Sequence, residues 1–501
     1  MRDQIKQLAQ ENNLKVTDLI ALSPANDPFY VGSPAQTRAA NWFSGLWQQF
    51  GYGDGVHLRR VHYQAQAQDP PVDLPLTLSW TVKDGPNKGQ KQETDTYINN
   101  DTCWRYLCSA AKFARYLGIV DAGSFVDRRN PEAIINARYL KPDDWEYRNP
   151  TPRAEIEGGW AEKQNEWESD DADRYALPDL PELADLPNDL PGTPYLDAQG
   201  YVGAPQGYLV EIWTEKSTMD DVLNPLCEQY SVNYIRGLGE MSISSVIDFL
   251  NRVRDASHSA RILYVSDHDP AGYQMPVSVA RKIEFYLSAL REEGHDIALQ
   301  PIVLSQEQID QYQLPPAPVK DNDKRKAGWD ETHGEQSVVE LDALEALHPG
   351  ALAQIVEAEI LNYYDPDHPQ KLRNARYELQ SLLDTETEEV IAKYQDKIEA
   401  LESEYVALVD DWEETQDRFS YLVADFQPDI ETHRSALDDI TARTQELHQE
   451  IRDQLETIDV EAPEIPSPDL PEESDTLLYA SDRSYLDQLS AYKHHRNGGT
   501  E

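Results

Sequence analysis

The fold of this chain is decided by two stretches of its sequence, YLVEIWTEKS (208–217) and RILYVSDHDPAG (261–272). Each begins with an apolar run of strand length, which predicts a buried strand, and each continues into acidic residues. In an open α/β sheet, chemistry gathers in the crevice at the carboxyl ends of the parallel strands. We therefore expect Glu215, Asp267 and Asp269 to meet at one edge of a sheet.

Three carboxylates at one strand edge repel one another unless a cation lies between them. Mg²⁺ is the expected cation, because it binds one or two carboxylates and completes its octahedron with water and phosphate oxygens. An isolated D-x-D after a strand more often caps a helix or a turn. Here, however, Glu215 follows another strand, and Gly237 and Gly239 close the strand between the motifs, where close approach to a phosphate needs glycine. The sequence predicts a Mg²⁺ site for phosphodiester chemistry, with Glu215, Asp267 and Asp269 as ligands.

Strand-like and helix-like segments alternate between residues 207 and 304. Short apolar runs are separated by segments whose apolar residues recur at helical spacing. This alternation is typical of βαβ units. It predicts an α/β fold in which helices flank a parallel sheet.

The charge balance is the property that fits a nucleic-acid enzyme least well. The 501 residues carry a formal net charge of −47, with 91 acidic against 44 basic side chains, whereas DNA-binding proteins present a basic surface. The acid is segregated into linker and coiled-coil segments, or it covers a surface adapted to a salt-rich cytoplasm, or the chain does not bind nucleic acid. Three surviving basic clusters favour a mixture of the first two explanations. They are Arg59-Arg60, Arg128-Arg129 and Lys324-Arg325-Lys326.

The sequence also indicates the compartment of the protein. No stretch is long and apolar enough to span a membrane, and the polar amino terminus has no signal-peptide core. Three cysteines cannot build a disulfide framework, and Cys103 and Cys108 lack the second ligand pair of a zinc site. We expect a cytoplasmic protein with packed thiols and no membrane association.

Composition and pattern divide the chain into five segments. Residues 1–150 mix helical segments with an alternating strand, as in a winged-helix-like α+β domain. Residues 151–206 form an acidic, proline-rich linker or insertion, and residues 207–365 hold the α/β pattern. Residues 371–458 have the apolar spacing of a coiled coil. Residues 459–501 form an acidic tail that we predict to be largely disordered.

Two arrangements of the coiled-coil segment are open. Pro428 interrupts the apolar series, so two helices joined near this proline would form a hairpin within one chain. A kinked helix would instead pair with a second chain. Only the second arrangement gives an independent reason to expect a dimer.

Three motifs together resemble the Toprim domain of the topoisomerase VI A subunit and its meiotic relatives. They are EKS, RGLGEMS and SDHDPAG, in that order, within residues 207–345. The segment ELDAL (340–344) resembles the E-L-x-A-L segment that closes the domain in this family. The stretch LPPAPVKDNDKRKAGW (314–329), which precedes it, resembles uncharacterised Toprim proteins of phages and mobile elements. The resemblance implies that Glu215, Asp267 and Asp269 are the Mg²⁺ ligands of a Toprim fold.

The resemblance also implies a reactive tyrosine upstream, in a winged-helix domain, with an arginine four residues before it. Arg59 and Tyr63 have this spacing, although the family usually has Tyr or Phe where this chain has His62. A phenol is a poor nucleophile at neutral pH, but a nearby guanidinium favours the phenolate and stabilises charge on the attacked phosphate. The expected product is a phosphotyrosine link between Tyr63 and DNA. Without the family resemblance, such a tyrosine is more often ordinary packing.

The predicted protein is a Mg²⁺-dependent enzyme of the type IIB topoisomerase kind that cleaves double-stranded DNA. Because the family's tyrosine and metal act in trans, the resemblance implies a homodimer, and the lack of a P-loop motif leaves strand passage to a separate ATPase subunit. The alternatives are a Toprim nuclease without a covalent intermediate and a non-catalytic DNA-binding or assembly factor. The residues expected to contact DNA are Arg60, Arg128, Arg129, Gly237, Gly239, Lys324 and Arg325. The arginine pair at 128 and 129 equally allows a surface ion pair with Asp127.

Overall fold

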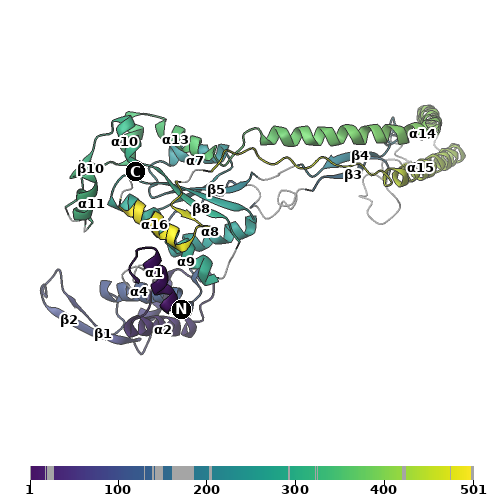
Figure 1. The fold of residues 1–501 in the computed structure, drawn as a ribbon. Helices are drawn as coiled ribbons and strands as arrows, with labels where there is room; N and C mark the ends of the chain where they lie inside the picture. Colours follow the sequence, from purple (N-terminus) through teal and green to yellow (C-terminus); the bar gives the residue numbers. More distant parts are fainter. Residues whose placement is uncertain are drawn as a thin grey trace. The chain divides into compact units, whose positions relative to one another are not determined.

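The computed structural model divides the chain into two compact units. Unit 1 comprises Met1–Pro142, Gln206–Asp365 and Asp469–Glu501, and unit 2 comprises Asp143–Pro205 and Pro366–Pro468. The chain therefore leaves unit 1 and returns to it twice (Figure 1). The residues that the structure describes are 2–16, 19, 28–128, 130–137, 140, 151–160, 185–201, 206–290, 294–321, 323, 325–419, 425–473 and 476–497.

A five-stranded sheet forms the centre of unit 1. Its strands are β5 (Tyr208–Thr214), β6 (Asn233–Arg236), β7 (Ser259–Val265), β8 (Ile297–Val303) and β11 (Tyr479–Ala480). Their order is β11-β8-β7-β5-β6; β6, β5, β7 and β8 are parallel, and β11 is antiparallel to β8. The predicted α/β fold with parallel strands is therefore confirmed. In this order the carboxyl ends of β5 and β7 are neighbours.

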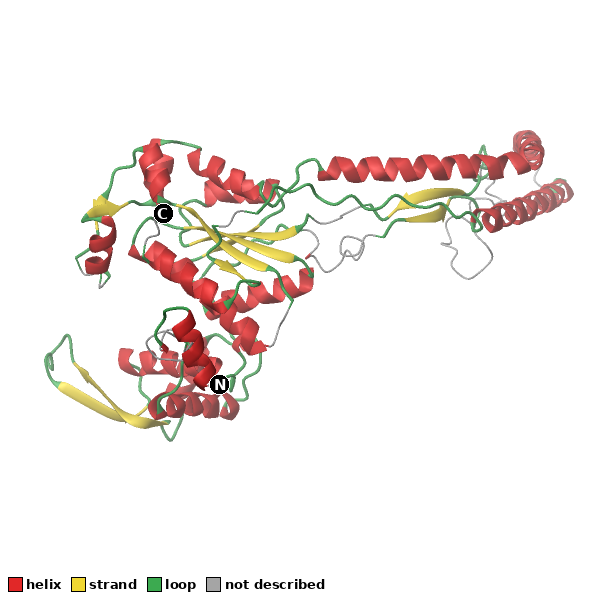
Figure 2. Ribbon diagram, in the orientation of Figure 1, coloured by secondary structure: helices red, strands yellow, loops and turns green. Residues whose placement is uncertain are grey.

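Helices cover both faces of this sheet (Figure 2). They are α7 (Asp220–Gln229), α8 (Ile243–Ala256), α9 (Pro270–Leu290), α10 (Gln306–Tyr312), α12 (Leu341–Leu347), α13 (Ala351–Ile360) and α16 (Tyr485–Arg496). Alternate strand residues point to opposite faces, so each strand contributes to two cores. Ile212 and Leu263 pack with α7 and α13 on one face, and Trp213 and Ile262 pack with α8 and α9 on the other. Three short elements follow α10, namely β9 (Ala317–Pro318), α11 (Lys326–His333) and β10 (Gln336–Val338).

Both edges of the sheet are covered by distant segments of the chain. At the β6 edge, Ile134 and Tyr234 exchange two backbone hydrogen bonds of 2.9 Å. At the β8 edge, β11 pairs with Ala298 and Leu299, and the preceding Leu478 is fully buried. The prediction of a largely disordered tail is thus wrong for residues 476–497, because their apolar side chains complete the core beside β8.

The amino-terminal part of unit 1 combines helices with one hairpin. Its elements are α1 (Arg2–Glu11), α2 (Pro34–Gln49), α3 (Leu58–Gln66), β1 (Asp73–Thr81), β2 (Lys91–Thr96), α4 (Asp101–Tyr116) and the short 3-10 helix η2 (Ala122–Ser124). β1 and β2 form a two-stranded antiparallel sheet with mostly exposed faces. Helices and a hairpin were expected here, and a specific winged-helix arrangement stays a prediction.

Unit 2 contains a long helical hairpin formed by α14 (His368–Phe419) and α15 (Gln427–Leu455). Ion pairs across it fix an antiparallel register, because Lys397 pairs with Glu450 while residues further along α14 pair earlier in α15. Buried apolar side chains from both helices form one core. The predicted coiled coil is therefore a hairpin within one chain, which removes it as an argument for a dimer.

The predicted linker is partly built into unit 2. β3 (Arg153–Glu157) and β4 (Tyr195–Gln199) form a two-stranded antiparallel sheet. Gln380 of α14 bonds the β4 backbone, donating to the Leu196 carbonyl and accepting from the Ala198 N–H. Residues 161–184, the most acidic part of the predicted linker, lie outside the described residues.

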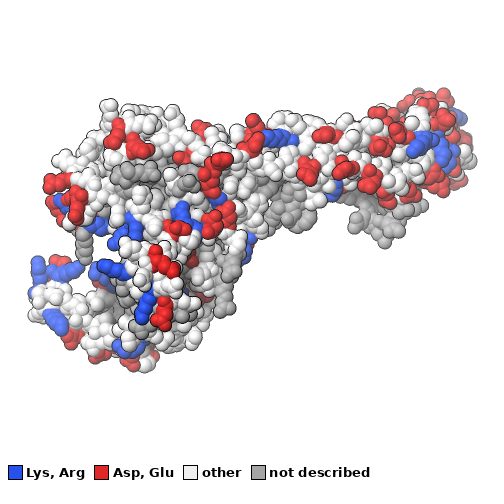
Figure 3. All heavy atoms as spheres, in the orientation of Figure 1, with Lys and Arg blue, Asp and Glu red and all other residues white. Residues whose placement is uncertain are grey.

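The negative charge is concentrated in unit 2. This unit holds a third of the residues and nearly half of the acidic side chains, but fewer than a third of the basic ones. In the view of Figure 3, Asp and Glu side chains crowd over α14 and α15. Segregation therefore accounts for much of the net charge, although unit 1 remains acidic overall.

Two expectations from composition concern thiols and membranes. Cys103 and Cys227 are buried, Cys108 is half-buried, and all three are free thiols. Burial raises the pKa of Cys108 to about 11, so this thiol stays protonated. Within the ranges that the structure describes, no helix has both the length and the apolarity needed to cross a membrane.

Candidate functional site

The ends of β5 and β7 bring two of the predicted carboxylates together. Thr214 of β5 is in register with Val265 of β7, so Glu215 and Asp267 follow neighbouring strands. The Asp267 N–H donates to Glu215 Oε1 at 3.1 Å. Glu215 and Asp267 are only 7% and 6% exposed. The sequence thus placed both residues at one edge of the sheet, and parallel pairing of their strands is the reason.

Asp269 lies in the turn that leads from β7 into α9. Its Oδ1 accepts the N–H groups of Ala271 at 2.7 Å and Gly272 at 2.6 Å. This is helix capping, with Pro270 as the first residue of α9. A Cβ at Gly272 would lie 1.9 Å from the Asp267 carbonyl oxygen, so only glycine fits this turn. Both capping hydrogen bonds are accepted by Oδ1.

Lys216 is the functional side chain that the sequence reasoning did not single out. Its Nζ lies 2.6 Å from Asp267 Oδ2 and 3.3 Å from Asp342 Oδ2. Glu340 is 3.8 Å from the same ammonium. The other oxygen of Asp267 accepts the N–H of Leu341 at 2.7 Å. The sequence signal for this part of the site was the pair Glu340 and Asp342, which lie on either side of Leu341 shortly after strand β10.

Burial and mutual repulsion perturb the carboxylates. The pKa of Glu215 is raised to about 8, mainly by burial and also by the charges of Asp267 and Asp269, against a backbone hydrogen bond from Asp267 that lowers it. Burial also raises the pKa of Asp269 above its usual range. Burial lowers the pKa of Lys216, but the hydrogen bond and charge of Asp267 together with the charges of Glu340 and Asp342 raise it, and the net shift is upward. The Lys216 ammonium is the positive charge in contact with Asp267 at this edge.

The side chains at this edge supply carboxylate oxygens. Carboxylate oxygens are what Mg²⁺ prefers, and Glu215, Asp267 and Asp269 together offer oxygens that are not used by the backbone hydrogen bonds described above. Among the described residues, no group of three or more His, Cys, Asp or Glu side chains lies close enough together to hold a metal ion. The Lys216 ammonium contacts Asp267 Oδ2, the oxygen that does not accept the Leu341 N–H.

The two glycines after β6 serve the local fold. Gly237 N–H donates to the Thr214 carbonyl at 2.7 Å, and Gly239 N–H donates to the Glu215 carbonyl at 3.2 Å. Gly239 has a φ of +92°, which favours glycine. The amides of both glycines bond the end of β5, and the expected approach of this backbone to a phosphate stays a prediction. Their role is to hold the turn against the carboxylate edge.

Two of the predicted DNA contacts lie next to the site. Arg128 is exposed, and its segment reaches the glycine turn through Asn130, whose Oδ1 accepts the Leu238 N–H at 3.0 Å. The Arg325 guanidinium donates to both oxygens of Asp323 and to the Pro270 carbonyl at 3.3 Å. The charges of Asp269 and Glu215 contribute to its raised pKa, after its hydrogen bond with Asp323. Arg129 and Lys324 lie outside the described residues.

The predicted nucleophile is on α3. Tyr63 is 58% exposed, and Arg59 and Arg60 are exposed one turn earlier. The neighbouring His62 is buried, with its Nδ1 2.7 Å from the Tyr97 hydroxyl oxygen. His62 thus takes a packing role where the family has an aromatic residue. Within the described parts of the chain, no hydrogen bond or ion pair joins α3 to the carboxylate edge.

A buried ion pair supports β5 below the site. Glu211 is fully buried and accepts two hydrogen bonds from Arg252 of α8, at 2.6 and 2.9 Å. Asn233 of β6 and the Trp213 indole donate to the same carboxylate. Every oxygen of this charge is therefore satisfied, which is the condition for burying it.

No protein-family model matches the chain, and comparison with curated proteins finds no match either. The resemblance to the Toprim domain therefore rests on the three motifs. The parallel sheet and the adjoining Glu215 and Asp267 are compatible with it.

Proposed function

We propose that this protein is a Mg²⁺-dependent DNA-cleaving enzyme related to the topoisomerase VI A subunit. The observation that carries the proposal is the hydrogen bond between Asp267 N–H and Glu215 Oε1, 3.1 Å long, at the carboxyl ends of adjacent parallel strands. This is the place where open α/β sheets carry their chemistry. Asp269, in the following turn, is the third carboxylate ligand in the proposal.

Tyr63 is the nucleophile in this proposal. Its phenolic oxygen would form a bond to phosphorus, the bond from phosphorus to a sugar oxygen would break, and the leaving oxygen would take a proton. Arg59, one helical turn before Tyr63, would bind the attacked phosphate and stabilise the charge that develops on it. The exposure of Tyr63 supports this role, because a nucleophile must reach its substrate.

Glu215, Asp267 and Asp269 would hold Mg²⁺, which when bound polarises the phosphate and neutralises charge that develops on it. Arg325 adds a cation close to Asp269 and contacts the backbone of the turn that holds it. Lys216 would compensate the charge of Asp267 before the metal binds, since its ammonium lies 2.6 Å from that carboxylate.

The proposal includes a homodimer in which Tyr63 of one chain acts with the carboxylates of the other. A mixing experiment tests it directly. Tyr63→Phe and Asp267→Ala proteins, each inactive, should regain cleavage when combined, because half of the mixed sites would have both parts intact. No recovery from a mixture that forms heterodimers would exclude action in trans. Strand passage would further need a separate ATPase subunit.

A second candidate is a Toprim nuclease, which would hydrolyse DNA with metal-activated water and use no tyrosine. The experiment that separates the two uses supercoiled plasmid and Mg²⁺, followed by denaturation with and without protease. Protein-linked DNA that is lost in Tyr63→Phe supports the tyrosine mechanism. Free nicked or linear DNA that persists in Tyr63→Phe supports the nuclease. Tyr377→Phe is the matched control, because Tyr377 is also highly exposed but lies on α14.

A third candidate is a DNA-binding or assembly factor without catalysis. Asp267→Asn distinguishes it, since this variant should lose cleavage while it keeps DNA binding. Failure of the wild-type protein to cleave DNA under all metal and salt conditions, alone and with an ATPase partner, would reject both enzymatic proposals.

A further inference from the structure

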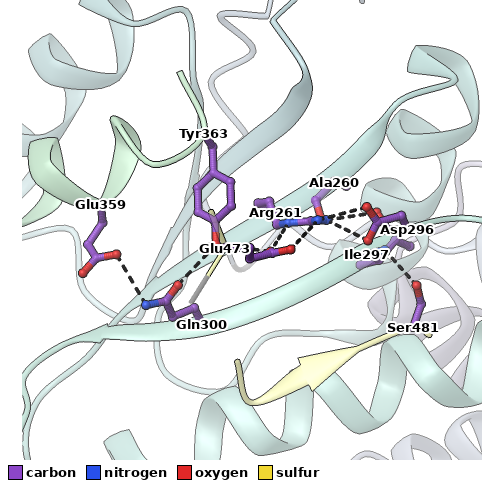
Figure 4. A network of polar contacts seen from close by, with 9 residues as sticks. All are labelled: Ala260, Arg261, Asp296, Ile297, Gln300, Glu359, Tyr363, Glu473 and Ser481. Atoms are coloured by element: carbon purple, nitrogen blue, oxygen red, sulfur yellow. Dashed lines mark hydrogen bonds and ion pairs between the residues drawn. The ribbon is translucent and has the colours of Figure 1, made fainter. Parts of the chain in front are cut away.

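The carboxyl-terminal segment is fixed firmly to the sheet. Its residue Glu473 accepts hydrogen bonds from Arg261 of β7 at 2.6 and 3.1 Å, and Arg261 also binds both oxygens of Asp296 (Figure 4). The guanidinium lies over the Tyr208 ring at 4.2 Å and is almost fully buried. Further along, Leu478 enters the core and β11 pairs with β8. This anchoring determines where α16 lies.

α16 runs along α9 in the opposite direction to it. It begins just after β11, where the Ser481 N–H donates to the carbonyl of Ile297 at the start of β8. Seven residues into the helix, the Tyr492 hydroxyl donates to Glu284 at 2.9 Å, and the Arg281 guanidinium lies over the Tyr492 ring. Because α9 starts at the turn that holds Asp269, the last turn of α16 is its end nearer the carboxylate edge.

This last turn is basic in an otherwise acidic protein. Lys493, His494 and Arg496 are all exposed. His495 is half-buried; its pKa is lowered to about 4 by burial, and also by the positive charges of His494 and Arg483 nearby. In the view of Figure 3, Lys and Arg side chains are visible around the position of α16 and α9.

Acidic side chains do not cancel this charge within α16. Asp482 and Asp487 lie at the other end, in the turn before the helix and in its first turn. Glu284, the nearest acid of α9 by contact, is bonded to the Tyr492 hydroxyl. The last turn therefore presents two permanent positive charges, from Lys493 and Arg496, to the solvent.

We propose that the last turn of α16, with Lys493 and Arg496, binds the phosphate backbone of double-stranded DNA that enters the carboxylate site. This inference rests on the proposed function, and it adds a DNA contact that the three motifs do not contain. Lysine and arginine bind phosphate by charge-assisted hydrogen bonds and carry no sequence information. The anchoring of Glu473 by Arg261 holds the mostly acidic tail against the sheet, so that this cation pair lies at the end of α16 that is nearer the carboxylate edge.

The test measures DNA affinity of the full-length protein against salt concentration by fluorescence anisotropy, with a labelled duplex of random sequence. The double variant K493S/R496S should bind more weakly at low salt. Each lost phosphate contact lowers the slope of log K against log salt by about 0.9, so loss of two contacts should lower it by about 1.8. The matched control K397S/R443S removes one lysine and one arginine from the hairpin of unit 2, changes net charge equally, and should leave the slope unchanged.

An unchanged slope in K493S/R496S would overturn the inference. Basic residues at a helix carboxyl end also stabilise the helix through its dipole. If that were their only role, the variant would lose some thermal stability while its slope stayed at the wild-type value. The slope can be measured whether or not the protein cleaves DNA. If the slope is lowered in K493S/R496S but the wild type does not cleave DNA, this inference stands and the enzymatic proposal is rejected. If the wild type cleaves DNA but the slope is unchanged in K493S/R496S, the enzymatic proposal stands and this inference is rejected.

Discussion

Lys216→Met is the substitution that examines the carboxylate edge most directly. Methionine keeps most of the side-chain length and removes the ammonium that lies 2.6 Å from Asp267. Breaking an exposed ion pair costs about 0–1 kcal/mol, and removing one partner of a buried pair costs about 3–5 kcal/mol. Asp267 is nearly buried but the Lys216 side chain is 27% exposed, so we expect a loss of about 1–3 kcal/mol in the free energy of unfolding.

Mg²⁺ should restore part of this loss. In the wild-type protein the Lys216 ammonium already neutralises Asp267, whereas in Lys216→Met a bound cation would be the main neutralising charge. The stability increment from a ligand grows with its affinity, so Mg²⁺ should stabilise the variant more than the wild type. A difference of about 1–3 kcal/mol corresponds to roughly a 5- to 150-fold change in affinity.

Urea unfolding followed by circular dichroism gives the free energy of unfolding of the wild type and of Lys216→Met, each in chelator and in saturating Mg²⁺. Lys326→Met is the control, because Lys326 forms an exposed pair with Asp321 and should respond little in either buffer. Equal losses for Lys216→Met in chelator and in Mg²⁺ would refute the reasoning, since they would mean that no cation binds beside Asp267.

Three further predictions concern buried ionisable side chains. Arg252→Met leaves the fully buried Glu211 without its partner, so urea unfolding should show a loss of about 3–5 kcal/mol, and a loss below 1 kcal/mol would contradict the buried pairing. His448 has a pKa lowered to about 4 by burial, and its Nδ1 accepts the Trp160 N–H at 2.7 Å. The contribution of neutral His448 to folding stability is therefore fully present above pH 6.5 and is lost as the pH falls toward 4. Thermal melts at pH 7.5 and pH 5 should show a smaller change with pH in His448→Gln than in the wild type. The pKa of Glu215, raised to about 8, keeps this carboxyl protonated at lower pH. Because a ligand must lose its proton to bind the metal, the Mg²⁺ affinity measured by calorimetry should rise about tenfold per pH unit between pH 6 and 8. An affinity that does not change with pH would exclude Glu215 as a ligand.

Local patterns predicted the central sheet well. Each strand of the motif pair is an apolar run followed by a polar turn, and this pattern depends on neighbours in sequence rather than on distant contacts. The convergence of Glu215 and Asp267 followed from the general rule on parallel strands, and the structure joins them by a hydrogen bond. The hairpin in unit 2 and the ordered tail could not be decided in this way. A heptad pattern specifies an apolar stripe but not whether its partner is the same chain, and a short strand such as β11 is stable only when a sheet edge receives it.

The sequence by itself determined that Glu215, Asp267 and Asp269 lie at the ends of buried strands, because periodicity and turn residues act over a few positions. Only the tertiary structure decided which charges surround them. Lys216 touches Asp267, the acids on either side of Leu341 approach from a segment more than seventy residues away, and Arg325 lies near Asp269. Electrostatic interactions depend on distance in space and on burial, not on separation along the chain. Their partners were therefore fixed only when the packing of the sheet and its loops was known.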